Sequence, residues 1–279
     1  MLGAIIGDIV GSRFEFVEDI NRGKDFALFA SVCRPTDDSF MTLAVAKALL
    51  LSNGDKEKLK TVVVDSMKSV AAKHPHTGWG ERFYRWLFLE SCPRPYNSYG
   101  NGAGMRISPV GWVADSENEV RVLSKIVTEV SHDHPEGLKG AEAVAMGVYL
   151  ARIGKTKEEI REKLKAYYPR LEDPEFTIKN IRGKYGYDTD GKWVTCQGSV
   201  PQAIIAFLDS EDFEDAVRNA VCIGGDSDTI GAMAGSIAEA YYGVSIDLED
   251  KALEYLTDDL KEIYFAFEAI KRRRQKRIP

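Results

Sequence analysis

Residues 224–242 read GGDSDTIGAMAGSIAEAYY, an acidic string that runs directly into a helix of small side chains. Gly231 and Gly235 stand about one turn apart in this helix, and alanines occupy positions 232, 234 and 238. Because each internal glycine costs a helix about 1 kcal/mol, close approach by a neighbouring helix is the expected compensation. The pattern predicts a tightly packed helix that holds the acidic residues at its N-terminus rigidly.

A second acidic string, TDDS at residues 36–39, precedes another apolar helix pattern. Either string can be read as a plain helix cap, because Asp, Ser and Thr cap helix N-termini. A cap needs one acceptor, however, and the two strings offer four aspartates, whose charges repel unless a cation lies between them. Hard oxygen ligands without histidine favour Mg²⁺ or Mn²⁺. If the fold joins the strings, a two-metal site becomes possible.

Residues 1–16, MLGAIIGDIVGSRFEF, predict a third helix of this kind, at the N-terminus. Its glycines recur every four residues and form a smooth stripe beside an apolar face of Ile and Val. Asp8 and Glu15 are seven residues apart, so a continuous helix would place them on one side. Either both face solvent, or Asp8 supports the metal site and Glu15 reaches a substrate, because a buried carboxylate needs a partner.

Helical periodicity covers most of the remaining chain, and alternating strand patterns are scarce. Pro201 suits the first turn of one helix. Residues 16–35 look irregular, and residues 173–192 predict a surface loop or an insertion. We therefore predict a single all-α domain over residues 1–279. The expected helices span Phe40–Leu51, Glu117–Val130, Gly140–Ile153, Ser199–Leu208, Asp212–Val221, Thr229–Tyr242 and Leu248–Lys271.

Composition narrows the class of protein further. Hydrophobic residues make up 44% of the chain, and the net charge of −6 gives no bulk attraction to nucleic acid or anionic lipid. No apolar run is long enough to span a bilayer, no secretory signal is recognisable, and the four cysteines form no CxxC pair. These features favour a cytoplasmic protein with reduced thiols. The basic residues 271–277 are interpreted as a complement to a helix dipole.

A glycine-rich loop and two histidine pairs carry weaker signals. The loop reads YNSYGNGAGM over residues 96–105 and is followed by Arg106. Its backbone N–H groups and the arginine suit a pyrophosphate, and Tyr96 and Tyr99 suit stacking on a base, although a plain turn has the same appearance. The histidine pairs, at 74 and 76 and at 132 and 134, fit no familiar zinc spacing. Surface histidines are the favoured interpretation.

Taken together and in this order, the strings resemble the ADP-ribosylglycohydrolase family, which includes the dinitrogenase reductase-activating glycohydrolases. The matching strings are GDIVGSRFE (7–15), TDDS (36–39), YGNGAGMR (99–106), SHDHPEGLKGA (131–141) and GGDSDT (224–229). The resemblance runs from residue 3 to about residue 243. Ser39 and Ser227 stand where many members have Thr, and neither change removes an expected metal oxygen.

The resemblance implies a compact orthogonal bundle of helices around a central dinuclear site for Mg²⁺ or Mn²⁺. Its metal ligands match Thr36, Asp37, Asp38, Asp226, Asp228 and Thr229, with Asp228 bridging the ions. Catalytic roles are expected for Glu15, near the scissile bond, and for Asp38 or Asp226 as proton acceptor. The residues expected at the substrate are Asp8, Ser98, Tyr99, Gly100, Asn101, Gly102, Met105, Arg106, His132 and Gly137.

The implied reaction is hydrolysis of the C1″ glycosidic bond of ADP-ribose, with ADP-ribosyl-arginine on a protein as the preferred substrate. Other linkages remain open: ADP-ribosyl-serine, O-acetyl-ADP-ribose and ADP-ribosylated nucleic acid. A non-catalytic ADP-ribose-binding protein and an unrelated two-metal phosphohydrolase are the competing classes. The expected partner is an ADP-ribosylated protein or ADP-ribose derivative met by a monomer, with no membrane and with nucleic acid only as a modified substrate.

Overall fold

The computed structural model describes residues 1–17, 23–183 and 192–275, and these residues form helices and connecting loops without a β-strand. The α-helices are α1 (Leu2–Gly11), α2 (Asp37–Ser52), α3 (Lys56–Ala71), α4 (Glu81–Tyr84), α5 (Gly102–Met105), α6 (Ser108–Val113), α7 (Glu117–Thr128), α8 (Pro135–Arg152), α9 (Lys157–Leu164), α10 (Ile178–Ile181), α11 (Cys196–Leu208), α12 (Phe213–Ile223), α13 (Ser227–Tyr242), α14 (Ile246–Glu254) and α15 (Asp258–Gln275). A π-helical turn spans Arg85–Leu89, and 3-10 turns span Pro169–Glu172 and Lys192–Val194. The prediction of an all-α protein is confirmed for the described residues.

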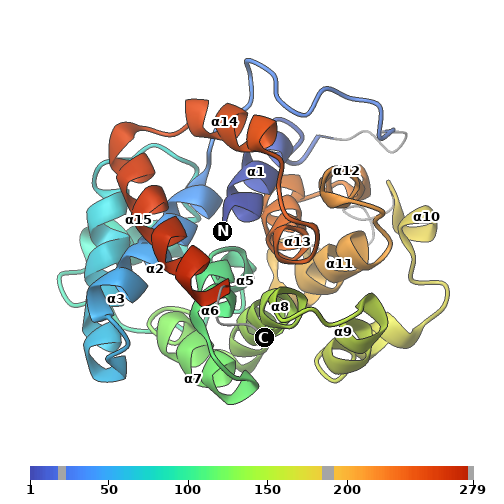
Figure 1. Ribbon diagram of the computed structural model, residues 1–279. Helices are drawn as coiled ribbons and strands as arrows, with labels where there is room; N and C mark the ends of the chain where they lie inside the picture. The colour runs from blue at the N-terminus through green and yellow to red at the C-terminus, as the bar shows by residue number, and fades with distance from the viewer. Residues whose placement is uncertain (18–22, 184–191, 276–279) are drawn as a thin grey trace.

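Helix α13 is the central element of the bundle, as its small side chains predict. Every residue from Ser227 to Glu239 is buried, so this helix is covered on all sides. Figure 1 shows α1 beside it near the middle of the molecule, and α8, α11 and α12 also pack against it. No helix within the described residues combines the length and the apolar character that crossing a bilayer requires.

The glycines of α1 and α13 bring the two helix backbones into direct contact. A Cβ built on Gly7 would lie 2.0 Å from the carbonyl oxygen of Gly231, and one on Gly3 would lie 2.1 Å from that of Gly235. A Cβ on Gly11 would lie 2.5 Å from Cα of Asp228. No side chain larger than hydrogen fits at these positions, so the glycine stripe sets the separation of the two helices.

Polar contacts hold the start of α1 against the last turns of α13. The carboxylate of Glu239, on α13, accepts a hydrogen bond from the backbone N–H of Gly3 at 2.8 Å. It also forms a buried ion pair with Lys271 of α15. Lys271 pairs in addition with Glu268 at 3.1 Å. The basic residues Arg272–Arg274 lie in the last turn of α15, where positive charge complements the helix dipole as predicted.

Several predicted helices have the wrong limits, and the one expected over Gly140–Ile153 begins at Pro135. Helix α1 ends at Gly11, so Glu15 lies in the turn that follows and is not stacked over Asp8 along one helix face. The single helix predicted over Leu248–Lys271 is two helices, α14 and α15, which are separated by a break at residues 255–257. The second helix starts after Thr257, whose carbonyl oxygen accepts from the backbone N–H of Lys261 at 3.0 Å.

Two further predictions require correction. Helix α11 begins at Cys196, so Pro201 lies inside it and not in its first turn. The carbonyl that loses its hydrogen bond belongs to Gln197, an exposed residue that water can reach. The segment 173–192 was predicted as a surface loop or insertion, yet its described part contains α10 and buries Phe176, Ile178 and Ile181. Residues 184–191 of that segment lie outside the described residues.

We expect Gly7→Ala to destabilise the protein by about 3 kcal/mol or more, because the added methyl group meets the Gly231 backbone and forces the helices apart. Gly147→Ala is the matched control in α8. Its Cβ would meet side-chain carbons of Ile237, the nearest at 3.0 Å, and of Leu164 at 3.5 Å, and no backbone among these nearest atoms, so we expect a change of about 1 kcal/mol or less. Urea unfolding followed by circular dichroism measures both. Equal stability of the two variants would contradict the proposed role of the glycine stripe.

Candidate active site

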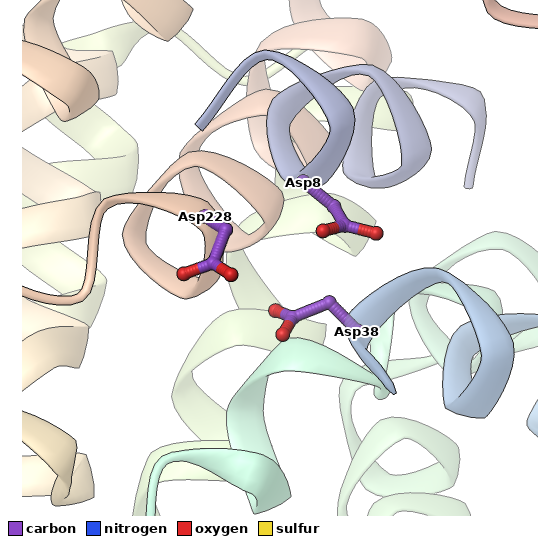
Figure 2. Close-up of side chains that lie close together, drawn as sticks. All are labelled: Asp8, Asp38 and Asp228. Atoms are coloured by element: carbon purple, nitrogen blue, oxygen red, sulfur yellow. The ribbon is translucent and has the colours of Figure 1, made fainter. Parts of the chain in front are cut away.

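The fold brings the two acidic strings together with the N-terminal helix. Figure 2 shows the carboxylates of Asp8, Asp38 and Asp228 pointing toward one another from α1, α2 and α13. One oxygen of each lies within 4.8 Å of one oxygen of each of the others. Glu15, Asp226 and Asp228 form a second group that meets the same limit. Asp228 belongs to both groups and is therefore the centre of the acidic cluster.

The start of α2 combines a helix cap with additional carboxylates. Thr36 is the N-cap residue, and its hydroxyl oxygen accepts a hydrogen bond from the backbone N–H of Asp38 at 3.3 Å. One residue is therefore enough for the cap, and Asp37 and Asp38 remain in the first turn with side chains on the cavity. The capping interpretation is correct for Thr36 and does not account for the two aspartates that follow.

At the start of α13, side chains and a backbone N–H donate hydrogen bonds to the carboxylates. Asp226 occupies the N-cap position but makes no side-chain cap. Its carboxylate accepts a hydrogen bond from Nδ2 of Asn101 at 2.6 Å. The hydroxyl of Thr229 donates to the carboxylate of Asp38 at 3.1 Å, which links α13 to α2. The backbone N–H of Thr229 donates to Asp228 at 2.9 Å.

Asp8 faces the interior and supports the α2 turn. Its carboxylate accepts hydrogen bonds from the backbone N–H of Thr36 at 2.9 Å, the Thr36 hydroxyl at 2.7 Å and the backbone N–H of Ser39 at 3.0 Å. The Ser39 hydroxyl is a fourth donor. Asp8 was predicted at the substrate, but it is fully buried behind the cavity wall, where both of its oxygens already have partners.

Burial and mutual repulsion raise the pKa values throughout the cluster. Burial raises the pKa of Asp8 to about 6, although the donors from Thr36 and Ser39 oppose it. Burial, followed by the negative charge of Asp226, raises the pKa of Glu15 to about 7. The pKa values of Asp37, Asp38 and Asp228 are raised well above the ordinary value, first by burial and then by neighbouring carboxylates. Buried carboxylates that lie this close together need bound protons or a cation to balance their charge.

The donor set fits a hard divalent cation. All candidate ligand atoms in the cluster are carboxylate or hydroxyl oxygens, which Mg²⁺ and Mn²⁺ prefer. Oδ1 of Asp38 is buried and has no hydrogen-bond partner among the described residues. A buried carboxylate oxygen without a donor is costly unless a ligand completes it. The acidic cluster is therefore able to hold metal ions.

A cavity of about 470 Å³ opens directly beside the acidic cluster. Its acidic end carries Glu15 and four aspartates, and its other wall carries arginine and aromatic side chains. The lining residues are Glu15, Phe16, Asp37, Asp38, Gly78, Gly80, Glu81, Arg82, Phe83, Tyr96, Ser98, Gly100, Asn101, Gly102, Met105, Arg106, His132, Val194, Asp226, Asp228 and Thr229. The lining thus combines a group of carboxylates with two arginines, Arg82 and Arg106.

Most of the predicted glycine-loop residues lie on this cavity: Ser98, Gly100, Asn101, Gly102, Met105 and Arg106. Asn101 ties the loop to the acidic cluster through its hydrogen bond to Asp226, and its Nδ2 also donates to Ser199 of α11 at 3.0 Å. Tyr99 is outside the lining and is 46% exposed, with its ring 5.0 Å from that of His134. Gly137 lies behind the loop, where a Cβ would come within 2.7 Å of the Ser98 carbonyl.

The interpretation of the histidines as surface residues is wrong for His132. This side chain is buried on the cavity wall, next to the fully buried Arg106. The wall also contains Arg82 and Phe83, which sequence reasoning missed. Nothing in the sequence pattern distinguishes the loop-rich segment 78–83, because its aromatic side chains serve the core as readily as a binding site.

Comparisons with known proteins identify the family of the chain. The family model described as ADP-ribosylglycohydrolase matches residues 1–277. The protein named ADP-ribosylhydrolase ARH3 from Mus musculus is 26% identical, over 88% of this chain and 83% of its own length. ADP-ribosylarginine hydrolase Tri1 from Pseudomonas putida (strain GB-1) is 27% identical, over 88% and 70%. ADP-ribosyl-[dinitrogen reductase] glycohydrolase from Rhodospirillum rubrum is 26% identical, over 87% and 84%.

A solved structure described as an ADP-ribosylglycohydrolase-related protein complex has the same fold. It superimposes with a TM-score of 0.64 and 22% sequence identity, and the match covers 97% of both chains. The expected all-α architecture of the family is therefore confirmed, and the family resemblance inferred from the motifs is confirmed by the model match over nearly the whole chain.

The raised carboxylate pKa values predict a pH-dependent stability. The folded state binds more protons than the unfolded state between the ordinary carboxylate pKa values and about 7, so without metal the free energy of unfolding falls as pH rises through this range. Divalent cations need the deprotonated ligands. We therefore expect Mg²⁺ or Mn²⁺ to raise Tm more at about pH 8 than at about pH 5.

Differential scanning fluorimetry in EDTA and in Mn²⁺ measures this shift. Asp228→Asn should reduce both the pH dependence and the Mn²⁺ effect. Asp250→Asn, on the exposed face of α14, is the control that should keep both. A Tm that does not respond to either cation at any pH would contradict the assignment of the acidic cluster as a metal site.

Proposed function

The chain belongs to the ADP-ribosylglycohydrolase family of enzymes, and on that premise we propose that it hydrolyses ADP-ribosyl-arginine on protein with two divalent cations, Mg²⁺ or Mn²⁺. The bond cleaved is the C1″ glycosidic bond of ADP-ribose. The observation that carries the proposal is the junction of an oxygen-only acidic cluster with a cavity that the glycine loop lines. Such a cavity has the size and the mixed polarity of a small-molecule site.

The proposed metal ligands are Thr36, Asp37, Asp38, Asp226, Asp228 and Thr229. The shared position of Asp228 in both carboxylate groups supports its assignment as the bridging ligand. When bound, the cations supply Lewis acidity, which orients the ribose diol and lowers the pKa of a water molecule. Asp8 keeps the α2 turn in place through its four hydrogen bonds.

The chain's own residues account for proton transfer and substrate orientation. Asp38 or Asp226 accepts the proton of the attacking water. Glu15 faces the leaving group, and its pKa of about 7 lets it give or take a proton near neutral pH. The glycine loop 98–102 and the guanidinium of Arg106 contact the diphosphate. The N–H groups of Gly100 and Asn101 hold the loop in place, because they donate to the Ser98 hydroxyl at 3.2 Å and to the Val194 carbonyl at 3.0 Å. Carboxylates and cations would together stabilise the charge that develops in the reaction, whereas ordinary glycosidases use two carboxylates alone.

The preference for an arginine linkage rests on charge and on the named relatives. Arginine joined to ADP-ribose presents a cationic guanidinium, which Glu15 and the acidic end of the cavity attract. The relative from Pseudomonas putida is named for ADP-ribosylarginine. The alternatives are the serine, O-acetyl-ADP-ribose and nucleic-acid linkages, and a non-catalytic ADP-ribose-binding protein.

We expect Mg²⁺-dependent release of ADP-ribose from ADP-ribosyl-arginine, and little release from the serine, O-acetyl and oligonucleotide substrates. Chromatography of free ADP-ribose measures the release, and EDTA should abolish it. Asp228→Asn should lower the rate by more than about a hundredfold, because even groups that merely orient metal ligands contribute about 10–100-fold. Asp250→Asn, far from the cavity lining, is the matched control and should keep the wild-type rate.

The outcomes separate the candidate functions. Release from another member of the panel would replace the arginine linkage by that linkage and keep the metal mechanism. Binding of ADP-ribose without release from any substrate would favour a non-catalytic protein. The absence of both binding and release would overturn the proposed function.

A further inference from the structure

A cluster of three polar side chains lies behind the glycine loop, away from the acidic cluster. Arg106 is fully buried on the cavity wall, with its guanidinium 5.3 Å from the centre of the Phe83 ring. Its Nη2 donates to the hydroxyl of Ser131 at 2.7 Å. Its Nε and Nη1 are buried without a hydrogen-bond partner in the described parts of the chain. This arginine therefore has one anchored nitrogen and two free ones.

The anchored nitrogen decides the protonation of His132. Nδ1 of His132 lies 3.3 Å from Nη2 of Arg106 and 2.8 Å from the Ser131 hydroxyl oxygen. An arginine side chain can only donate hydrogen bonds. The Ser131 hydroxyl oxygen accepts the bond from Arg106, and its O–H donates to Nδ1 of His132. A proton on Nδ1 would oppose the N–H of Arg106. Nδ1 is therefore the acceptor, and the imidazole proton belongs on Nε2.

Nε2 of His132 points at the bare backbone of the glycine loop. A Cβ at Gly102 would lie 3.3 Å from Nε2, and one at Gly100 would lie 3.6 Å from it. Both glycines line the cavity together with His132. The missing side chains leave space beside the donor, so an oxygen atom of a ligand held by the loop is able to accept its hydrogen bond.

We propose that Arg106 and Ser131 are positioning residues that keep His132 neutral with its proton on Nε2, so that His132 donates a hydrogen bond to an oxygen of ADP-ribose at the glycine loop. The proposal deepens the proposed function and rests on it for the identity of the ligand. The Ser131 hydroxyl does not line the cavity, so it acts on a ligand only through His132.

The electrostatic surroundings agree with a neutral ring. Burial, then the positive charges of Arg106 and Arg82, lower the pKa of His132 well below its ordinary value. The other titratable groups around this pair are Tyr96 and Cys196. Burial raises the pKa of Tyr96, and it raises that of Cys196 to about 12. Neither therefore supplies a negative charge near neutral pH that would favour the imidazolium.

Nitrogen-15 NMR of the histidine rings in the full-length protein tests the proposal without reference to activity. The chain has only four histidines, and His132→Gln identifies the relevant signals. We expect an unprotonated Nδ1 and a protonated Nε2 that stay unchanged from about pH 5.5 to about pH 8. In Ser131→Ala and in Arg106→Gln we expect a mixture of tautomers and the appearance of a titration. Ser124→Ala, which removes another buried hydroxyl, is the matched control.

Calorimetric titration with ADP-ribose tests the donor itself. His132→Phe keeps the ring shape but removes the hydrogen bond, so we expect about five- to tenfold weaker binding. His132→Gln places an amide donor close to the position of Nε2 and should recover part of that loss. Ser131→Ala should weaken binding less than His132→Phe. The loss should be greatest at about pH 8, where neutral His132 divides between two tautomers, and smaller at lower pH, because an imidazolium donates from Nε2 in any case.

Each result either supports the proposal or overturns a defined part of it. A wild-type His132 with its proton on Nδ1, or one that titrates in the ordinary range, would overturn the tautomer assignment even if Arg106→Gln fails to fold. Equal affinity of wild type and His132→Phe would overturn the donor role alone. If wild type binds no ADP-ribose, the proposed function fails and the donor role fails with it.

Discussion

The site depends on the contact between the backbones of α1 and α13. Side chains at Gly3 and Gly7 would collide with carbonyl groups of α13, and one at Gly11 would collide with Asp228 itself. The hydrogen atoms at these positions let the two helices approach until Asp8 and Asp228 belong to one cluster. A packing constraint in the most buried part of the bundle thus sets the distance between carboxylates that come from opposite ends of the chain.

Close packing of the helices brings several carboxylates together, and the surrounding hydrogen-bond donors compensate their mutual repulsion only in part. Four hydrogen bonds stabilise the carboxylate of Asp8, while Asn101 donates to Asp226 and Thr229 donates to Asp38. Burial nevertheless keeps the pKa values of all three carboxylates raised, and one oxygen of Asp38 has no donor among the described residues. The protein therefore maintains a region of unbalanced negative charge beside a cavity, at a cost in stability that cation binding would offset. Arg106 and Arg82 place the opposite charge across the same cavity.

Much of this arrangement could be predicted from the sequence, because its signals are local. The glycine and alanine pattern identified α13 as a tightly packed helix, and two acidic strings at helix starts identified the cluster. The sequence does not reveal the break between α14 and α15, because amphipathic periodicity continues across it and residues 255–257 contain no glycine or proline to mark a helix end. The buried state of His132 was missed for another reason. Its environment comes from Arg106 and Phe83, which are remote in sequence and carry no shared motif.

We propose that the acidic cluster holds two divalent cations. Titration of the metal-free protein with Mn²⁺, followed by the electron paramagnetic resonance signal of the free ion, counts bound ions directly and needs no substrate. We expect two bound Mn²⁺ ions per chain in the wild type. Asp228→Asn should lose bound ions, because Asp228 is common to both carboxylate groups. A free-ion signal that rises from the first addition, as in buffer alone, would contradict it.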